Sequence, residues 1–209
     1  MTSSKRKGKT AAAFGVLPID KVAFGASLAK HARLLDRMPD LGKPGIDQLE
    51  YAIHKAPPTV EMLMFGRGER MGPGEVMLLV AAADALGKGK PMVRPRDHLV
   101  EDPEVHAGDL HVKGSLTFAG NLFVLGDLVV DGVLGEYSHG AHCLVAGSIR
   151  ARGIKCGGTI VSGKEISAEV VFVEIDGRIG AATGLEAKLV IVEDKESPVR
   201  GKVKATEKV

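Results

Sequence analysis

Three observations predict an α+β fold, in which a small N-terminal helical domain precedes a C-terminal single-stranded β-helix (a β-solenoid). Glycine recurs every six residues in the C-terminal half, and aliphatic residues follow each glycine at a spacing of two. The N-terminal half instead carries apolar residues at helical spacing. Aromatic residues make up only 4% of the chain and tryptophan is absent, so aliphatic side chains must fill the core in thin, regular layers.

The repeat starts at Gly108 with Gly-Asp-Leu-His-Val-Lys and continues as Gly114-Ser-Leu-Thr-Phe-Ala. A spacing of two places Leu and Val on one face of a short strand. Glycine, which has no Cβ, lets the backbone bend at a corner, so that strand and corner wind into stacked coils. A spacing of six is too short for a meander or a sandwich, whose turns come every ~8–12 residues. The repeat glycines are Gly108, Gly114, Gly120, Gly126, Gly132, Gly147, Gly163, Gly177 and Gly201.

The N-terminal half predicts several short helices. Apolar stripes indicate helices within 19–38, 44–56 and 59–65, and the apolar run of 75–86 ends at Gly87, where a helix commonly stops. Lys5, Arg6, Lys7 and Lys9 make the first residues a basic tail that could contact an anionic membrane surface, although a solubilising role is favoured. The predicted division is a disordered tail at 1–12, a helical domain at 13–88, a linker at 89–105, the solenoid at 106–205 and a tail at 206–209.

The tandem Gly-x-Leu-x-Val-x pattern resembles the bactofilins, the polymer-forming bacterial cytoskeletal proteins. The resemblance covers about residues 106–205 and implies a right-handed β-helix, no cofactor, no catalysis and stacking of solenoids into filaments. The helical segment in front of the repeat departs from that family, whose tails are short. If it covered one end of the solenoid, while Lys202–Val209 covered the other, it would disfavour filaments.

The repeat is interrupted between Leu134 and Leu144 by a chemically dense segment. Its candidate binding residues are Glu136, Tyr137, His139 and His142, and His139, His142 and Cys143 are weak candidates for a metal site because imidazole and thiolate suit zinc. A catalytic site of the kind found on hexapeptide solenoids is a further alternative. The favoured interpretation is a structural bulge, in which Tyr137 packs over the solenoid edge and Cys143 is a small core residue.

The remaining sequence supports no other class of chemistry. There is no P-loop, nucleotide fingerprint or CxxC motif, and two cysteines are too few for a disulfide scaffold. The net charge of +2 and the scarcity of aromatics argue against nucleic-acid binding, and no apolar run has the length of a membrane span. We therefore expect a cytoplasmic, non-enzymatic structural or interaction protein without a cofactor, which associates with itself as a homo-oligomer or with another protein. The alternatives are a discrete inhibitor- or immunity-type binding module and a hexapeptide-solenoid enzyme (a metal hydratase or an acyltransferase).

Overall fold

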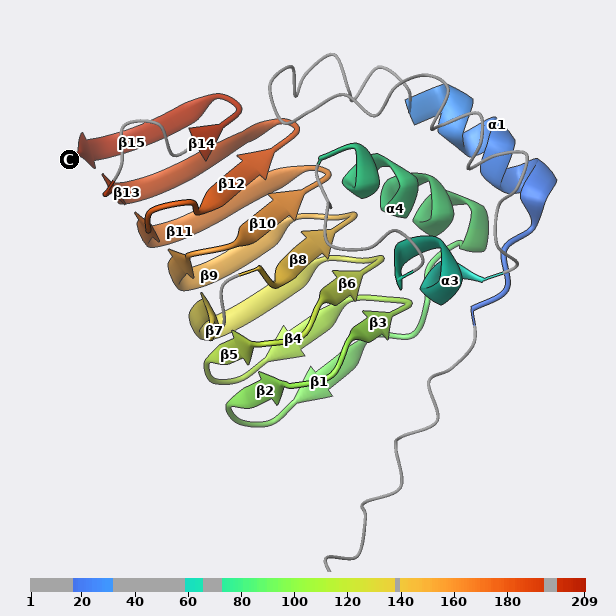
Figure 1. Cartoon of the computed structure of the whole chain (residues 1–209), viewed down its shortest axis with the longest axis horizontal. Helices are drawn as coiled ribbons and strands as arrows, with labels where there is room; N and C mark the ends of the chain where they lie inside the picture. The colour runs from blue at the N-terminus through green and yellow to red at the C-terminus, as the bar shows by residue number, and fades with distance from the viewer. Residues whose placement is uncertain (1–16, 32–58, 66–72, 138–139, 194–198) are drawn as a thin grey trace, which may run out of the picture.

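The computed structural model describes residues 17–31, 59–65, 73–137, 140–193 and 199–209, and its main feature is a parallel β-solenoid with helices along one side (Figure 1). Seven strands of the larger sheet, from β1 to β15, stack in parallel, so the chain completes six turns between them. The predicted α+β class and the β-helix are therefore confirmed, whereas the handedness of the solenoid stays a prediction. The strands are β1 (Met92–Arg94), β2 (His98–Val100), β3 (Glu104–His106), β4 (Leu110–Val112), β5 (Leu116–Phe118), β6 (Leu122–Val124), β7 (Leu128–Glu136), β8 (His142–Val145), β9 (Ile149–Cys156), β10 (Thr159–Ser162), β11 (Glu165–Val173), β12 (Arg178–Ala181), β13 (Gly184–Val192), β14 (Val199–Arg200) and β15 (Val203–Lys208).

Each coil has three sides, and one six-residue repeat forms one side. Leu110 pairs with Met92 before it and with Leu128 after it, a step of 18 residues, or three repeats, each time. The larger sheet holds two sides, as separate strands in the first two coils and as one long strand from β7 onward. The smaller sheet, in the order β14-β12-β10-β8-β6-β3, is the third side.

The interior of the solenoid is a column of mainly aliphatic side chains. Because successive residues of a strand point to opposite faces, every second residue enters the interior. Leu110, Leu128 and Ile149 are in register on neighbouring coils and are fully buried. The scarcity of aromatics follows from this geometry, since coils stacked about 4.8 Å apart leave room for one layer of aliphatic side chains per turn.

The repeat glycines are required by close approach between coils rather than by the bending of corners. A Cβ atom added to any of the nine would lie 2.9 Å or less from a backbone atom of the preceding coil, for example 2.5 Å from the nitrogen of Asp109 in the case of Gly126. Of the nine, only Gly201 has a positive φ, of 101°. The role predicted for these glycines, bending without steric clash, is thus corrected: glycine lets one coil rest on the one beneath it.

The predicted linker, residues 89–105, is in fact the first coil of the solenoid, so that prediction was wrong. β1 pairs with β4, β2 with β5 and β3 with β6. Lys90, Arg96 and Asp102 stand 18 residues before Gly108, Gly114 and Gly120. No described coil lies beneath the first one, so these positions need no glycine, and the repeat that identifies the later coils is missing here.

Polar side chains at the corners connect one coil to the next. The backbone amides of Ser115, Asp127 and Ser148 donate to the carboxylates of Asp97, Asp109 and Asp127 at 2.7, 2.8 and 2.8 Å. The acceptor stands directly after a repeat glycine in Asp109 and Asp127. The Gly-Asp pair therefore supplies both the close approach and a hydrogen bond for an amide at the corner.

The described helices are α1 (Lys21–His31), α3 (Val60–Phe65) and α4 (Pro73–Leu86), which confirms helices at these places. Asp20 caps α1 by accepting the amides of Val22 and Ala23 at 2.9 and 3.0 Å. α4 ends before Gly87, whose φ is 73° and whose amide donates to the carbonyl of Ala83 at 3.0 Å. The predicted helix at 44–56, residues 32–38 of the first predicted helix and the tail at 1–12 lie outside the described residues.

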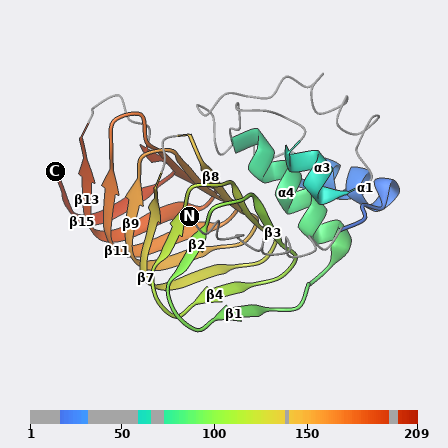
Figure 2. The same ribbon diagram turned by 60° about the horizontal axis from the view of Figure 1, so that its bottom comes forward.

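The helices lie along the side of the solenoid rather than across its end (Figures 1 and 2). Their apolar residues share one core with the outward side chains of the smaller sheet, among them Phe123, Leu144 and Val161, which are in register and fully buried. α4 is buried on nearly all sides because it lies between α1 and the strands β8 and β10. The suggestion that these helices cap an end of the solenoid was therefore wrong, and β15 continues the solenoid to Lys208 instead of forming a charged cover.

Candidate interaction surfaces

The segment predicted to carry a binding site is a three-residue insertion at one corner of the solenoid. Leu128 pairs with Ile149, a step of 21 residues instead of 18, and the extra residues fall between β7 and β8. Glu136 closes this corner by accepting the amide of Ala141 at 2.9 Å. Tyr137 is 79% exposed, so the prediction that it packs over the solenoid edge was wrong.

The candidate metal ligands of this segment point to different sides of the sheet. Cys143 lies in the interior, in register with Leu122 and Ile160, and its burial raises the pKa of the thiol far above the ordinary range. His142 precedes it in β8 and therefore points to the opposite face. His139 lies outside the described residues. Within the described ranges, no group of three His, Cys, Asp or Glu side chains is arranged to hold a metal ion.

The second cysteine, Cys156, is also an interior residue. Its Sγ donates to the carbonyl oxygens of Gly158 and Arg178 at 3.5 and 3.3 Å. Burial raises the pKa of its thiol to about 12, so the reactive thiolate is scarce at neutral pH. Neither cysteine is placed to act as a nucleophile.

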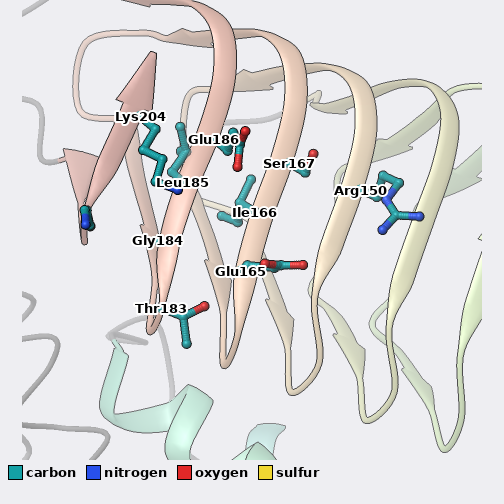
Figure 3. Close-up of a pocket in the computed structure, with 10 residues that line it drawn as sticks. Arg150, Glu165, Ile166, Ser167, Thr183, Gly184, Leu185, Glu186 and Lys204 are labelled. Atoms are coloured by element: carbon teal, nitrogen blue, oxygen red, sulfur yellow. The ribbon is translucent and has the colours of Figure 1, made fainter.

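A shallow depression crosses the larger sheet where its strands begin (Figure 3). Arg150, Ser167, Glu186 and Lys204 are in register on β9, β11, β13 and β15, and all four face outward. Glu186 and Lys204 stand opposite each other, and such pairs of opposite charge on neighbouring strands stabilise a sheet surface. Because the depression is open and lined by outward side chains of a regular sheet, we assign it a structural role.

The other half of the larger sheet has an apolar outer surface that no described helix covers. Val133, Gly153, Val170 and Leu189 form one row in register across β7, β9, β11 and β13. Phe172 and Ile191 stand in the next row of outward residues, which also contains Lys155, and both are partly buried. We call Val133, Val170, Phe172, Leu189 and Ile191 the lateral strip. Val133 and Val170 are 41% and 40% exposed, so the strip offers apolar area to a partner.

Paired charges of both signs border the lateral strip. Lys155 contacts Glu174 at 2.9 Å on one side, and Lys188 contacts Glu169 at 3.2 Å on the other. Ion pairs at such exposed positions add little to stability. They do give the strip a border without an excess of either charge, which is typical of the polar rim of an interface.

The first coil carries polar side chains at interior positions, which the glycine repeat does not predict. Arg94, His98, Glu104 and His106 are in register with Val112, Leu116, Leu122 and Val124 of the next coil. We call these four residues the polar rung. The sequence offers little signal for them, because no glycine repeat marks the register of the first coil.

The polar rung is a connected network around one carboxylate. Oε2 of Glu104 lies 3.0 Å from Nε2 of His106, 3.4 Å from Nε2 of His98 and 3.9 Å from a guanidinium nitrogen of Arg94. Burial raises the pKa of Glu104, but the hydrogen bond with His106 and the charge of a protonated His98 outweigh it and leave the pKa below its ordinary value. The carboxylate therefore stays ionised at neutral pH, within the end of the solenoid.

No family model, curated protein or solved structure matches this chain. The functional proposal therefore rests on the surfaces described above. Among the described helices, none is long and apolar enough to cross a membrane.

Proposed function

We propose that this protein is a non-enzymatic structural or interaction protein, and that it associates with a second copy of itself through the lateral strip. The observation that carries the proposal is the row of exposed valines on the larger sheet. The smaller sheet also has an apolar outer face, but there the helices bury Phe123, Leu144 and Val161 completely. The lateral strip has no such cover among the described residues.

A second copy suits the lateral strip because the strip is self-complementary. A two-fold contact brings the same patch of both subunits together, so the patch must tolerate its own charges. The borders carry one Lys–Glu pair each, Lys155 with Glu174 and Lys188 with Glu169, and so avoid a large like-charge surface. The open sheet face also allows the apolar rows of two copies to interdigitate.

The proposal that the protein is not an enzyme has separate support. His142 and Cys143 point to opposite faces of β8, and both thiols are buried in the interior with raised pKa values. The arrangement thus favours the structural interpretation over a hexapeptide-solenoid enzyme. The resemblance to the bactofilins is carried by the repeat and by the solenoid fold, and we extend it to self-association but not to filaments.

Sedimentation velocity over a concentration series tests the proposal. The wild-type protein should shift from monomer towards dimer with increasing concentration, and the double variant Val133→Glu/Val170→Glu should remain monomeric. Val22→Glu is the matched control, since Val22 is an exposed valine on α1, away from the strip, and should behave as the wild type. A wild-type protein that stays monomeric at every concentration would overturn the proposed contact and favour a discrete module that binds another protein.

A further inference from the structure

The two ends of the solenoid interior differ in chemistry. At the C-terminal end, Val199, Val203 and Ala205 pack against the interior column as partly buried aliphatic residues, and Lys208 stands in register with the interior residue Val190. At the N-terminal end, four interior positions of the first coil hold the polar rung, beside Met92 and Val100. An aliphatic end layer favours stacking of another solenoid, because stacking removes its apolar surface from water.

The strand edges of the first coil would otherwise allow stacking. Among the described residues, β1, β2 and β3 each have a neighbouring strand on one side only. Such edges present unpaired N–H and C=O groups to an incoming chain, and proteins block them with charged residues that point inward. Here four of the inward positions are polar, and two of the four, Arg94 and Glu104, carry opposite charges.

We infer that the first coil is a built-in end cap, and that the polar rung prevents a second copy of this chain from stacking on the N-terminal end of the solenoid. Stacking would remove the Glu104 carboxylate and the Arg94 guanidinium from water. It would also place the imidazoles of His98 and His106 against the end layer of the incoming copy. Both imidazoles already face Glu104 within one chain, so stacking gives these three groups no better partner to offset that loss.

The second coil has aliphatic residues at the positions of the polar rung, and these residues define the test variant. The quadruple variant Arg94→Val/His98→Leu/Glu104→Leu/His106→Val gives the first coil the residues that Val112, Leu116, Leu122 and Val124 provide one layer above. It is made in the Val133→Glu/Val170→Glu background, so that association through the lateral strip does not contribute. This inference does not rest on the lateral contact, because the background remains informative if that contact does not exist.

Sedimentation velocity and small-angle X-ray scattering are measured for the quadruple variant, for its background and for a control variant. The control, Arg96→Val/Glu101→Leu in the same background, adds apolar area at exposed positions of the first coil without changing the rung. We expect the quadruple variant to associate at least about tenfold more tightly than the background, with particles extended along the solenoid axis, while the control matches the background.

Two outcomes would overturn the inference. In the first, the quadruple variant folds, as judged by circular dichroism, but sediments like its background. In the second, the background itself already forms axially extended assemblies through its first coil, as shown by cross-links between β1 strands of two copies. If the quadruple variant does not fold, Arg94→Val/Glu104→Leu replaces it. This pair removes the ion pair and keeps both imidazoles, and the same two results decide the matter.

Discussion

Replacement of Gly126 by alanine tests whether the glycine repeat is a packing requirement. The added Cβ would lie 2.5 Å from the nitrogen of Asp109 and 2.6 Å from the carbonyl carbon of Gly108. Comfortable contacts are about 3.5–4.0 Å, so the two coils would have to separate locally by about 1 Å. Overpacking of this kind costs about 1–3 kcal/mol, whereas a glycine-to-alanine change returns about 0.4–1 kcal/mol through the unfolded chain.

The separation would also strain a hydrogen bond at the same corner, between the amide of Asp127 and Asp109 at 2.8 Å. We therefore expect Gly126→Ala to lower the free energy of unfolding by about 2 kcal/mol. Gly153→Ala is the matched control. Gly153 is also a solenoid glycine without positive φ, but its added Cβ would come no closer than 3.5 Å to any neighbouring atom. It should be neutral or stabilising by up to about 1 kcal/mol.

Urea unfolding followed by circular dichroism measures both variants against the wild type. A clearly lower midpoint for Gly126→Ala, together with an unchanged or higher midpoint for Gly153→Ala, would support the packing explanation. Equal midpoints for the two variants would refute it, and would return the repeat glycines to the role of flexible corners.

Three further predictions follow from the buried groups. Phe123→Ala should destabilise the protein by about 3–5 kcal/mol and expose α4 to proteolysis, because Phe123 lies in the core between the helices and the solenoid. Resistance of α4 to proteolysis equal to that of the wild type would contradict the packing of α4 on Phe123. The pKa of Glu104 is lowered from 4.5, so its carboxylate stabilises the fold above that pH and this contribution is lost in acid. Glu104→Gln should thus reduce the fall in melting temperature between about pH 5 and 3, and an unchanged slope would count against it. Cys143 and Cys156 should react with a thiol reagent only after unfolding, and rapid modification of the native protein would show that they are not interior residues.

The helical segments show both the strength and the limit of sequence patterns. The apolar run of residues 75–86 and the stop at Gly87 predict α4 closely, because a glycine that ends a helix in the left-handed conformation is a local signal. The place where α4 packs is not a local property. It depends on Phe123, Leu144 and Val161, outward residues of three coils that come into one column only when the coils are stacked.

The candidate site shows the same division. The sequence locates the interruption near Glu136, and the structure confirms an insertion there. Successive residues of β8 point to opposite faces of the sheet, however, so His142 and Cys143 are separated. The polar rung was missed for the opposite reason. Residues 89–105 lack the glycine repeat, so the register that places Arg94 and Glu104 in the interior becomes visible only from their pairing with the second coil.

The sequence by itself determined the solenoid, because a six-residue glycine period with aliphatic residues two apart imposes stacked coils wherever another coil lies beneath. Tertiary structure alone decided which side the helices cover, that the first coil exists, and that its interior is charged. The physical reason is that a repeat records contacts between equivalent residues of neighbouring coils. The contact with the helices and the open end of the first coil do not repeat from coil to coil, so neither leaves a period in the sequence.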